Sequence, residues 1–202
     1  MQSNEFNVEV IDNKGAELFA QIAPELNRLH DENLTLLMAT MDSDNIPHAS
    51  YTPFAHVDGA YYIFIADIAA HTQHVKNHPT FNIMIVDDES KTRNIYGRKR
   101  VSYQVNATEI ERDHPEFDKG IEALTLRAGK TVNVLKEMGD FRLFRLTPTK
   151  GTLVTGFGKA FRLDPQNPEN IQHLTGNGGK GHVREADYER MQNRGHGQAH
   201  SA

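Results

Sequence analysis

The chain has 202 residues, of which 38% are hydrophobic, and this length and composition suit one domain with an ordinary core. Its 22 Lys and Arg against 27 Asp and Glu give a net charge of -5, which argues against general binding of nucleic acid or of an anionic membrane. The absence of cysteine excludes disulfides, thiolate nucleophiles and iron–sulfur clusters, so any metal centre would depend on histidine, carboxylate or a porphyrin.

The N-terminus predicts a helix rather than a targeting segment. Leu18, Ile22, Leu26 and Leu29 recur at helical spacing, and Pro24 is expected to kink this helix or to start a second one. No apolar run approaches the roughly 20 residues of a membrane span, and the first ten residues lack the form of a secretion signal. We therefore expect a cytoplasmic protein with a helical segment over residues 1–33 that packs on the rest of the domain.

Strand patterns follow from residue 34. Residues 34–41, 48–57 and 60–66 alternate or run apolar, and Asp58-Gly59 between the last two is a hairpin signal, so three antiparallel strands in a meander are expected. A short helix over 69–79 ends at Pro79, and residues 81–87 return as a buried strand.

The second half continues with strands around one helical excursion. Residues 98–110 place Val101, Tyr103 and Val105 on one face, as in a half-buried strand. Residues 113–140 read as helix, with Asp113 as N-cap and a break at Gly129. Two strands, 140–148 and 151–163, complete the set, and a short helix is expected over 168–174.

These elements favour a mainly β fold. About seven strands at short intervals, with helices only at the ends and in two excursions, are typical of a small antiparallel barrel. We assign the barrel to residues 34–164, with its helical excursion near 113–139. Residues 165–202 form a C-terminal loop and tail rich in Gly and His, which has little to bury.

Two clusters could bind an anionic ligand. In "GRKR" (97–100), Arg98 and Arg100 would share one face of a strand and suit a phosphate or two carboxylates, although a solvated, charged strand edge explains them equally well. In "AAHTQH" (69–74), the free N–H groups of a helix start could receive an anion, and His71 and His74 share a helical face.

The stretch "HLTGNGGKGH" (173–182) places two histidines around a glycine-rich loop. It is not a phosphate-binding P-loop, because Gly181 follows the Gly-Lys pair where Ser or Thr is needed. Either a disordered tail or a mobile arm that closes over a ligand fits this pattern. Asp140, at a junction of helix and strand, is a turn residue or the hydrogen-bond partner of a ligating histidine.

The order of several motifs carries a family resemblance. "LTLLMATMDSDNIPHASYTPF", "YYIFIADIAAHTQHVKNHPTFNIMIVDDE", "RKRVSY" and "DFRLFRLTPTKGTLVTGFGKAF" together resemble the HugZ/HutZ haem-utilisation family, a branch of the pyridoxamine 5'-phosphate oxidase-like proteins. The resemblance covers about residues 15–182. It implies a homodimeric antiparallel split β-barrel of the FMN-binding-protein type, with ligand sites between the subunits.

The resemblance also implies a role for individual residues. His182 matches the histidine that ligates haem iron, and His173 is the second candidate. Asp140 matches an aspartate that hydrogen-bonds the ligating histidine, and Thr35 a threonine that helps to place that aspartate. Arg98 and Arg100 then become candidates for the haem propionates.

Three functions stay open from the sequence. The first is opening of the porphyrin ring with O2 and electrons from an unidentified donor, which releases iron. The second is storage or transfer of haem without cleavage. The third is an FMN-dependent oxidoreductase, although the chain has "AAHTQH" where flavin-binding relatives usually carry a Ser-Arg-Lys phosphate grip.

Overall fold

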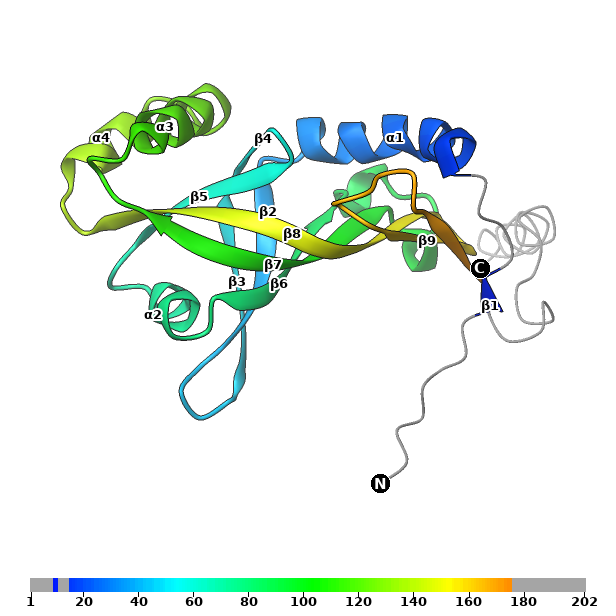
Figure 1. Ribbon diagram of the computed structural model, residues 1–202, viewed down its shortest axis with the longest axis horizontal. Coiled ribbons are helices and arrows are strands. Elements are labelled where there is room, and N and C mark those ends of the chain that lie inside the picture. The colour runs from blue at the N-terminus through cyan, green and yellow to red at the C-terminus, as the bar shows by residue number, and fades with distance from the viewer. Residues whose placement is uncertain (1–8, 11–14, 176–202) are drawn as a thin grey trace, which may run out of the picture.

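One antiparallel sheet organises the molecule (Figure 1). The computed structural model describes residues 9–10 and 15–175. The strands are β1 Glu9–Val10, β2 Thr35–Met41, β3 Pro47–Pro53, β4 Ala55–Val57, β5 Ala60–Ala66, β6 Thr80–Val86, β7 Arg100–Ile110, β8 Phe141–Gly156, β9 Lys159–Leu163 and β10 Gln172–Thr175. The helices are α1 Gly15–Glu32, α2 Ala70–Asn77, α3 Pro115–Ala128 and α4 Thr131–Glu137, with 3-10 turns η1 Glu89–Lys91 and η2 Ile95–Gly97.

The long strand β8 explains why the sheet is split. Along one edge it pairs with β7 over nearly its whole length. Along the other edge its first half, up to Leu146, pairs with β5, and its second half, from Gly151, pairs with β9. The sheet continues through β10 to β1 at one end and through β6 and β2 to β3 at the other, and it does not close. The predicted mainly β, split-barrel class is thus confirmed.

Strand β5 lies between two hydrophobic cores. Its residues from Tyr61 to Ile65 are all buried. Tyr61 and Ile63 belong to the larger core under α1, whereas Tyr62 and Phe64 belong to a smaller core under α3 and α4. This two-sided burial is the reason that β5 is apolar at successive positions instead of alternating.

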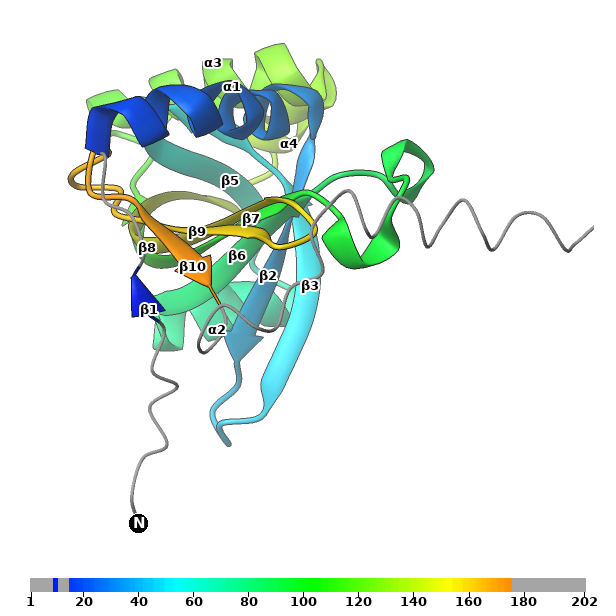
Figure 2. The ribbon, with the colours of Figure 1, turned by 90° about the vertical axis from the view of Figure 1, so that its right-hand side faces the viewer.

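The helices cover the sheet unequally (Figures 1 and 2). Helices α1, α3 and α4 lie on one side and α2 lies on the other. The helix α1 passes through Pro24 as a single element, so no second helix starts there, and it buries Ile22 and Leu29. None of the helices in the described residues has the length and apolarity that a membrane crossing requires.

Several predicted elements are confirmed. The turn between β4 and β5 has positive φ at Asp58 (51°) and Gly59 (77°), as the hairpin signal requires. Strand β7 alternates buried Val101, Tyr103 and Val105 with more exposed residues. Gly129, with φ of 87°, separates α3 from α4.

Other predictions near the N-terminal half and α3 were wrong. The strand predicted over 48–57 breaks at the buried Phe54, whose amide donates to the carbonyl of Leu34, and the chain then leaves β3 to pair β4 with β5. The expected meander therefore stops at β3. The N-cap of α3 is His114, which accepts from the amide of Glu116, and not Asp113.

The C-terminal half also differs from the prediction. The strands predicted over 140–148 and 151–163 are instead β8, which is continuous to Gly156, and β9 after a tight turn. Residues 172–175 form β10 rather than a helix, because they pair with β9 while Ile171 is buried in the main core.

Candidate functional site

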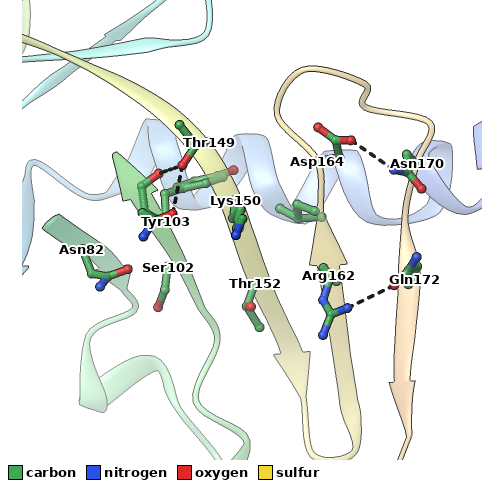
Figure 3. A pocket seen from close by; sticks show the side chains of 13 residues that line it. Asn82, Ser102, Tyr103, Thr149, Lys150, Thr152, Arg162, Asp164, Asn170 and Gln172 are labelled. Atoms are coloured by element: carbon green, nitrogen blue, oxygen red, sulfur yellow. Dashed lines mark hydrogen bonds between the residues drawn. The ribbon is translucent and has the colours of Figure 1, made fainter. Parts of the chain in front are cut away.

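A polar groove of about 690 Å³ runs over the outer face of the sheet, opposite α1 (Figure 3). Pairing places Gln172, Arg162, Thr152 and Ser102 in one row across β10, β9, β8 and β7. Lys150 and Gln104 form the adjacent row, with Asn82 beyond them on β6. The volume falls in the range of about 300–1,000 Å³ that is usual for small-molecule and cofactor sites.

The groove carries two cations on its face. Lys150 and Arg162 are exposed, and no carboxylate in the described part of the chain forms an ion pair with either. Arg162 donates a long hydrogen bond, 3.4 Å, to the side-chain oxygen of Gln172. These two side chains can bind carboxylate or phosphate groups, and the amides and hydroxyls around them add neutral donors.

One carboxylate, that of Asp164, lies at the rim of the groove. It accepts hydrogen bonds from the amides of Gln166 (3.0 Å) and Asn167 (3.3 Å) and from the side chain of Asn170 (3.0 Å). The side-chain bond from Asn170 and the backbone bonds hold its pKa below the usual value, so it stays anionic. Asp164 therefore fixes the β9–β10 connection.

The floor of the groove is thin. Tyr103 on β7 and Gly151 on β8 face each other across the strands, and a Cβ on Gly151 would come within 2.6 Å of the tyrosine ring. The ring of Tyr103 thus occupies the space on the inner side that a side chain at position 151 would fill. A ligand in the groove is separated from this ring by one layer of strands.

The two predicted arginines do not form a pair on one strand face. Arg98 precedes β7 and is used by the fold, since its Nε donates to the carbonyl of Asp87 (2.6 Å) and its guanidinium pairs with Glu89 (2.9 Å). Arg100 begins β7 on the same face as Ser102 and donates to the carbonyl of Arg98 (2.8 Å). Only Arg100 lies on the face that carries the groove.

The predicted histidine pair lies elsewhere, on α2. His74 shares a hydrogen bond of 3.1 Å with the hydroxyl of Thr40, and its ring lies 5.1 Å from that of His48. Burial lowers the pKa of His71, and the neighbouring His48 and His74 lower it further. Within the described residues, no group of three or more histidines and carboxylates is arranged to hold a metal ion.

Thr35 and Asp140 are not joined to each other. Thr35 begins β2, where it is exposed and pairs with Pro53. Asp140 directly precedes β8 and is exposed, and its carbonyl accepts from the amide of Asp67 (2.7 Å). Among the hydrogen bonds of the described residues, none links the two side chains.

His173 lies on β10 but faces away from the groove. Its ring stacks on Phe161 with centroids 4.9 Å apart, and its Nε2 lies 3.4 Å from the carbonyl of Gly158. Since Gln172 lines the groove, the alternation of β10 directs its neighbour to the opposite face. His182, the other candidate iron ligand, lies outside the described residues.

Comparisons with known proteins agree with this architecture. The family described as pyridoxamine 5'-phosphate oxidase matches residues 22–155. The chain belongs to the pyridoxamine 5'-phosphate oxidase family. Within this family it is 32% identical over 161 residues to a protein of Vibrio cholerae named heme oxygenase HutZ, a match that covers 80% of this chain and 92% of HutZ.

Two solved structures of the family are similar to this chain. The crystal structure of Vibrio cholerae HutZ, described there as a heme storage protein, has a TM-score of 0.60 and 32% identity over 63% of this chain and 89% of that one. Campylobacter jejuni ChuZ has a TM-score of 0.71 and 29% identity over 82% of this chain and 68% of that one. The resemblance to the HugZ/HutZ branch is thereby confirmed.

Sequence reasoning missed Lys150 and Arg162. A signal for Arg162 was present, because in "KAFRL" it alternates with the apolar Phe161 and Leu163 and so must face outward. Lys150 lay between the two strands that the sequence predicted, and only the continuity of β8 places it on the same face as Thr152.

Proposed function

We propose that this protein binds haem in the outer-face groove and opens the porphyrin ring to release iron. The observation that carries the proposal is the relationship to HutZ, which extends over 92% of that protein. The groove suits the two propionate carboxylates of haem, since it presents Lys150 and Arg162, and neither forms an ion pair with a carboxylate of the described residues.

Each residue has a defined task in this proposal. Lys150, Arg162 and Arg100 bind the propionates and so fix the orientation of the ring. His182 is the proposed iron ligand, and the inward orientation of His173 supports this choice over the alternative. Asp140 holds the second ring nitrogen of the ligand histidine, which sets its tautomer and its basicity. Bound haem supplies the oxygen chemistry itself.

A second copy of the chain would complete the site. Thr35 and Asp140 do not meet within one chain, and the outer face of β2 and β3 exposes the cross-strand pair Leu37 and Tyr51, at 42% and 66%. Two such faces packed together would bury apolar surface and would bring residues of one subunit beside those of the other. We therefore propose that the functional unit is a homodimer.

Storage or transfer of haem is the second candidate, because the HutZ structure is described as that of a storage protein. A single experiment separates the two. The apo-protein is saturated with hemin, ascorbate is added under air, and both the absorbance spectrum and free ferrous iron, detected with a chelator dye, are followed.

Ring opening predicts loss of the Soret band, a new bilin absorbance and about one iron released per haem. A stable Soret band under these conditions would support storage. If the purified protein instead binds FMN and shows no saturable binding of hemin, the flavin-dependent alternative replaces both.

A further inference from the structure

Four buried or half-buried aromatic rings lead inward from the floor of the groove. The ring centroids are 5.7 Å apart between Tyr103 and Tyr61, 5.5 Å between Tyr61 and His30, and 4.2 Å between His30 and His56. Tyr103, Tyr61 and His30 are 6%, 1% and 4% exposed. The proposed function gives no role to this series.

The centre of the series is a hydrogen bond between two titratable groups. The hydroxyl of Tyr61 lies 2.7 Å from Nε2 of His30, and the bond is buried. When the imidazole is neutral with its proton on Nδ1, the phenol donates to Nε2. Phenol and imidazole then stand as donor and base in a dry environment.

The surroundings keep both groups neutral. Burial, together with the neighbouring His56 and Arg127, lowers the pKa of His30 to about 3. Burial also raises the pKa of Tyr61 well above its ordinary value, and Tyr103 adds to the effect. At any pH near neutrality the phenol keeps its proton and the imidazole keeps a free lone pair.

We propose that Tyr103, Tyr61 and His30 form a relay that draws an oxidising equivalent from the groove into the core. A one-electron oxidant in the groove takes an electron from Tyr103, which recovers one from Tyr61 and ends unchanged. Tyr61 loses its phenolic proton to Nε2 of His30 as it loses the electron. The products are a neutral tyrosyl radical at position 61, an imidazolium at position 30 and the reduced oxidant.

Chemistry and geometry both favour this sequence. An oxidised phenol is a far stronger acid than an imidazolium, so His30 accepts the proton even with its lowered pKa. The adjacent Tyr62 provides a contrast, because it faces the other core and donates to Glu116 (2.6 Å) instead of to a neutral base. The relay rests on the proposed function only for its purpose, which is to protect the groove and its ligand from oxidants formed there.

The test places a photo-oxidant in the groove and needs no haem. Because the chain has no cysteine, Thr152→Cys gives one attachment point for a ruthenium polypyridyl label, in the row between Arg162 and Ser102. The remaining tyrosines, Tyr51, Tyr96 and Tyr188, are replaced by Phe in every sample, which leaves only Tyr61, Tyr62 and Tyr103. A flash in the presence of an electron acceptor then generates the oxidant.

Transient absorbance and electron paramagnetic resonance report the tyrosyl radical. The relay predicts a long-lived radical that Tyr62→Phe leaves unchanged and that Tyr61→Phe removes. The two variants are matched, because each removes one hydroxyl from a buried tyrosine. The relay also predicts that the radical forms more slowly in D2O. This rate is measured on the labelled protein that keeps Tyr61, so the result does not depend on whether Tyr61→Phe folds.

Two results would overturn the relay: an equal radical yield and lifetime after Tyr61→Phe, or formation at the same rate in D2O. Failure of haem binding is recorded separately by hemin titration of the unlabelled parent chain, because the label itself would occupy the groove. The relay and the proposed function can therefore fail independently.

Discussion

His30 makes the stability of the fold depend on pH. Its pKa is about 3 in the folded protein, and the ordinary value near 6.5 applies to the unfolded chain. The unfolded state therefore takes up a proton below about pH 6.5 that the folded state refuses. Stability is fully present above this pH and falls, by about 1.4 kcal/mol per pH unit for this one group, as the pH drops towards 3.

Urea unfolding at pH 7.5, 6 and 5 measures this dependence. We expect the free energy of unfolding to fall only slightly from pH 7.5 to 6 and by more from pH 6 to 5, and to fall less in His30→Gln, which cannot titrate there. His56 and His71, whose pKa values burial also lowers, contribute the slope that persists in the variant. An identical slope in both proteins would mean that His30 is protonated in the folded state.

The contact between Gly151 and Tyr103 gives a second prediction for a single residue. Gly151→Ala places a Cβ 2.6 Å from the ring of Tyr103, so the ring must move, and we expect a loss of about 1–3 kcal/mol in the free energy of unfolding. Gly139→Ala is the control, because nothing lies within 4 Å of a Cβ at that position. Equal thermal melting of the two variants would contradict the packing described for the groove floor.

Individual residues were predictable where one face of a strand decides their burial. Val101, Tyr103 and Val105 were placed correctly because their alternation reflects one buried face. The prediction that Arg98 and Arg100 share one strand face was wrong, because it required the strand to begin at Arg98, whereas β7 begins at Arg100. The partners of Arg98, Asp87 and Glu89, lie on a loop whose course no local pattern reveals.

Arg127 on α3 joins elements that are distant in sequence. Its guanidinium donates to the carbonyls of His30 (2.6 Å), Asn33 (2.7 Å) and Phe54 (3.1 Å) and lies 5.0 Å from the ring of Phe54. It thereby satisfies carbonyls at the end of α1, where a positive charge is also favoured by the helix dipole.

We expect Arg127→Ala to lower the free energy of unfolding by about 2–4 kcal/mol, because buried carbonyls lose a charged donor. Arg112→Ala is a matched control, since Arg112 also donates to three carbonyls, those of Lys136, Met138 and Phe141, but at an exposed site where water replaces it. Chemical denaturation of both variants is the measurement. A loss after Arg112→Ala as large as that after Arg127→Ala would refute this role.

Turns and breaks that depend on the backbone preference of single residues were predicted well. Strands whose extent depends on pairing with distant strands were predicted poorly. The hairpin at Asp58-Gly59 and the break at Gly129 follow from backbone preferences of single residues. By contrast, the continuity of β8 depends on its partners β7, β5 and β9, and β10 is a strand only because β9 is beside it. The segment after residue 164 was expected to bury little, yet Ile171 is 1% exposed.

For the whole molecule, the apolar outer face of β2 and β3 predicts self-association. Leu37→Lys together with Tyr51→Lys places two charges on the proposed contact, and we expect this variant to shift towards the monomer in sedimentation velocity. Ile68→Lys is the control, because Ile68 is 91% exposed in the turn between β5 and α2, and it should leave the distribution unchanged. A dimer that withstands the first variant as well would place the interface elsewhere.

Hemin titration of charge-reversal variants tests whether haem occupies the outer-face groove. Lys150→Glu with Arg162→Glu reverses the two groove cations, and Arg93→Glu with Lys130→Glu makes the same change in net charge at exposed sites outside the groove. We expect the first pair to weaken hemin binding at least tenfold, about 1.4 kcal/mol or more, while the second pair binds like the parent chain. Equal affinities for both pairs would contradict binding of haem in this groove.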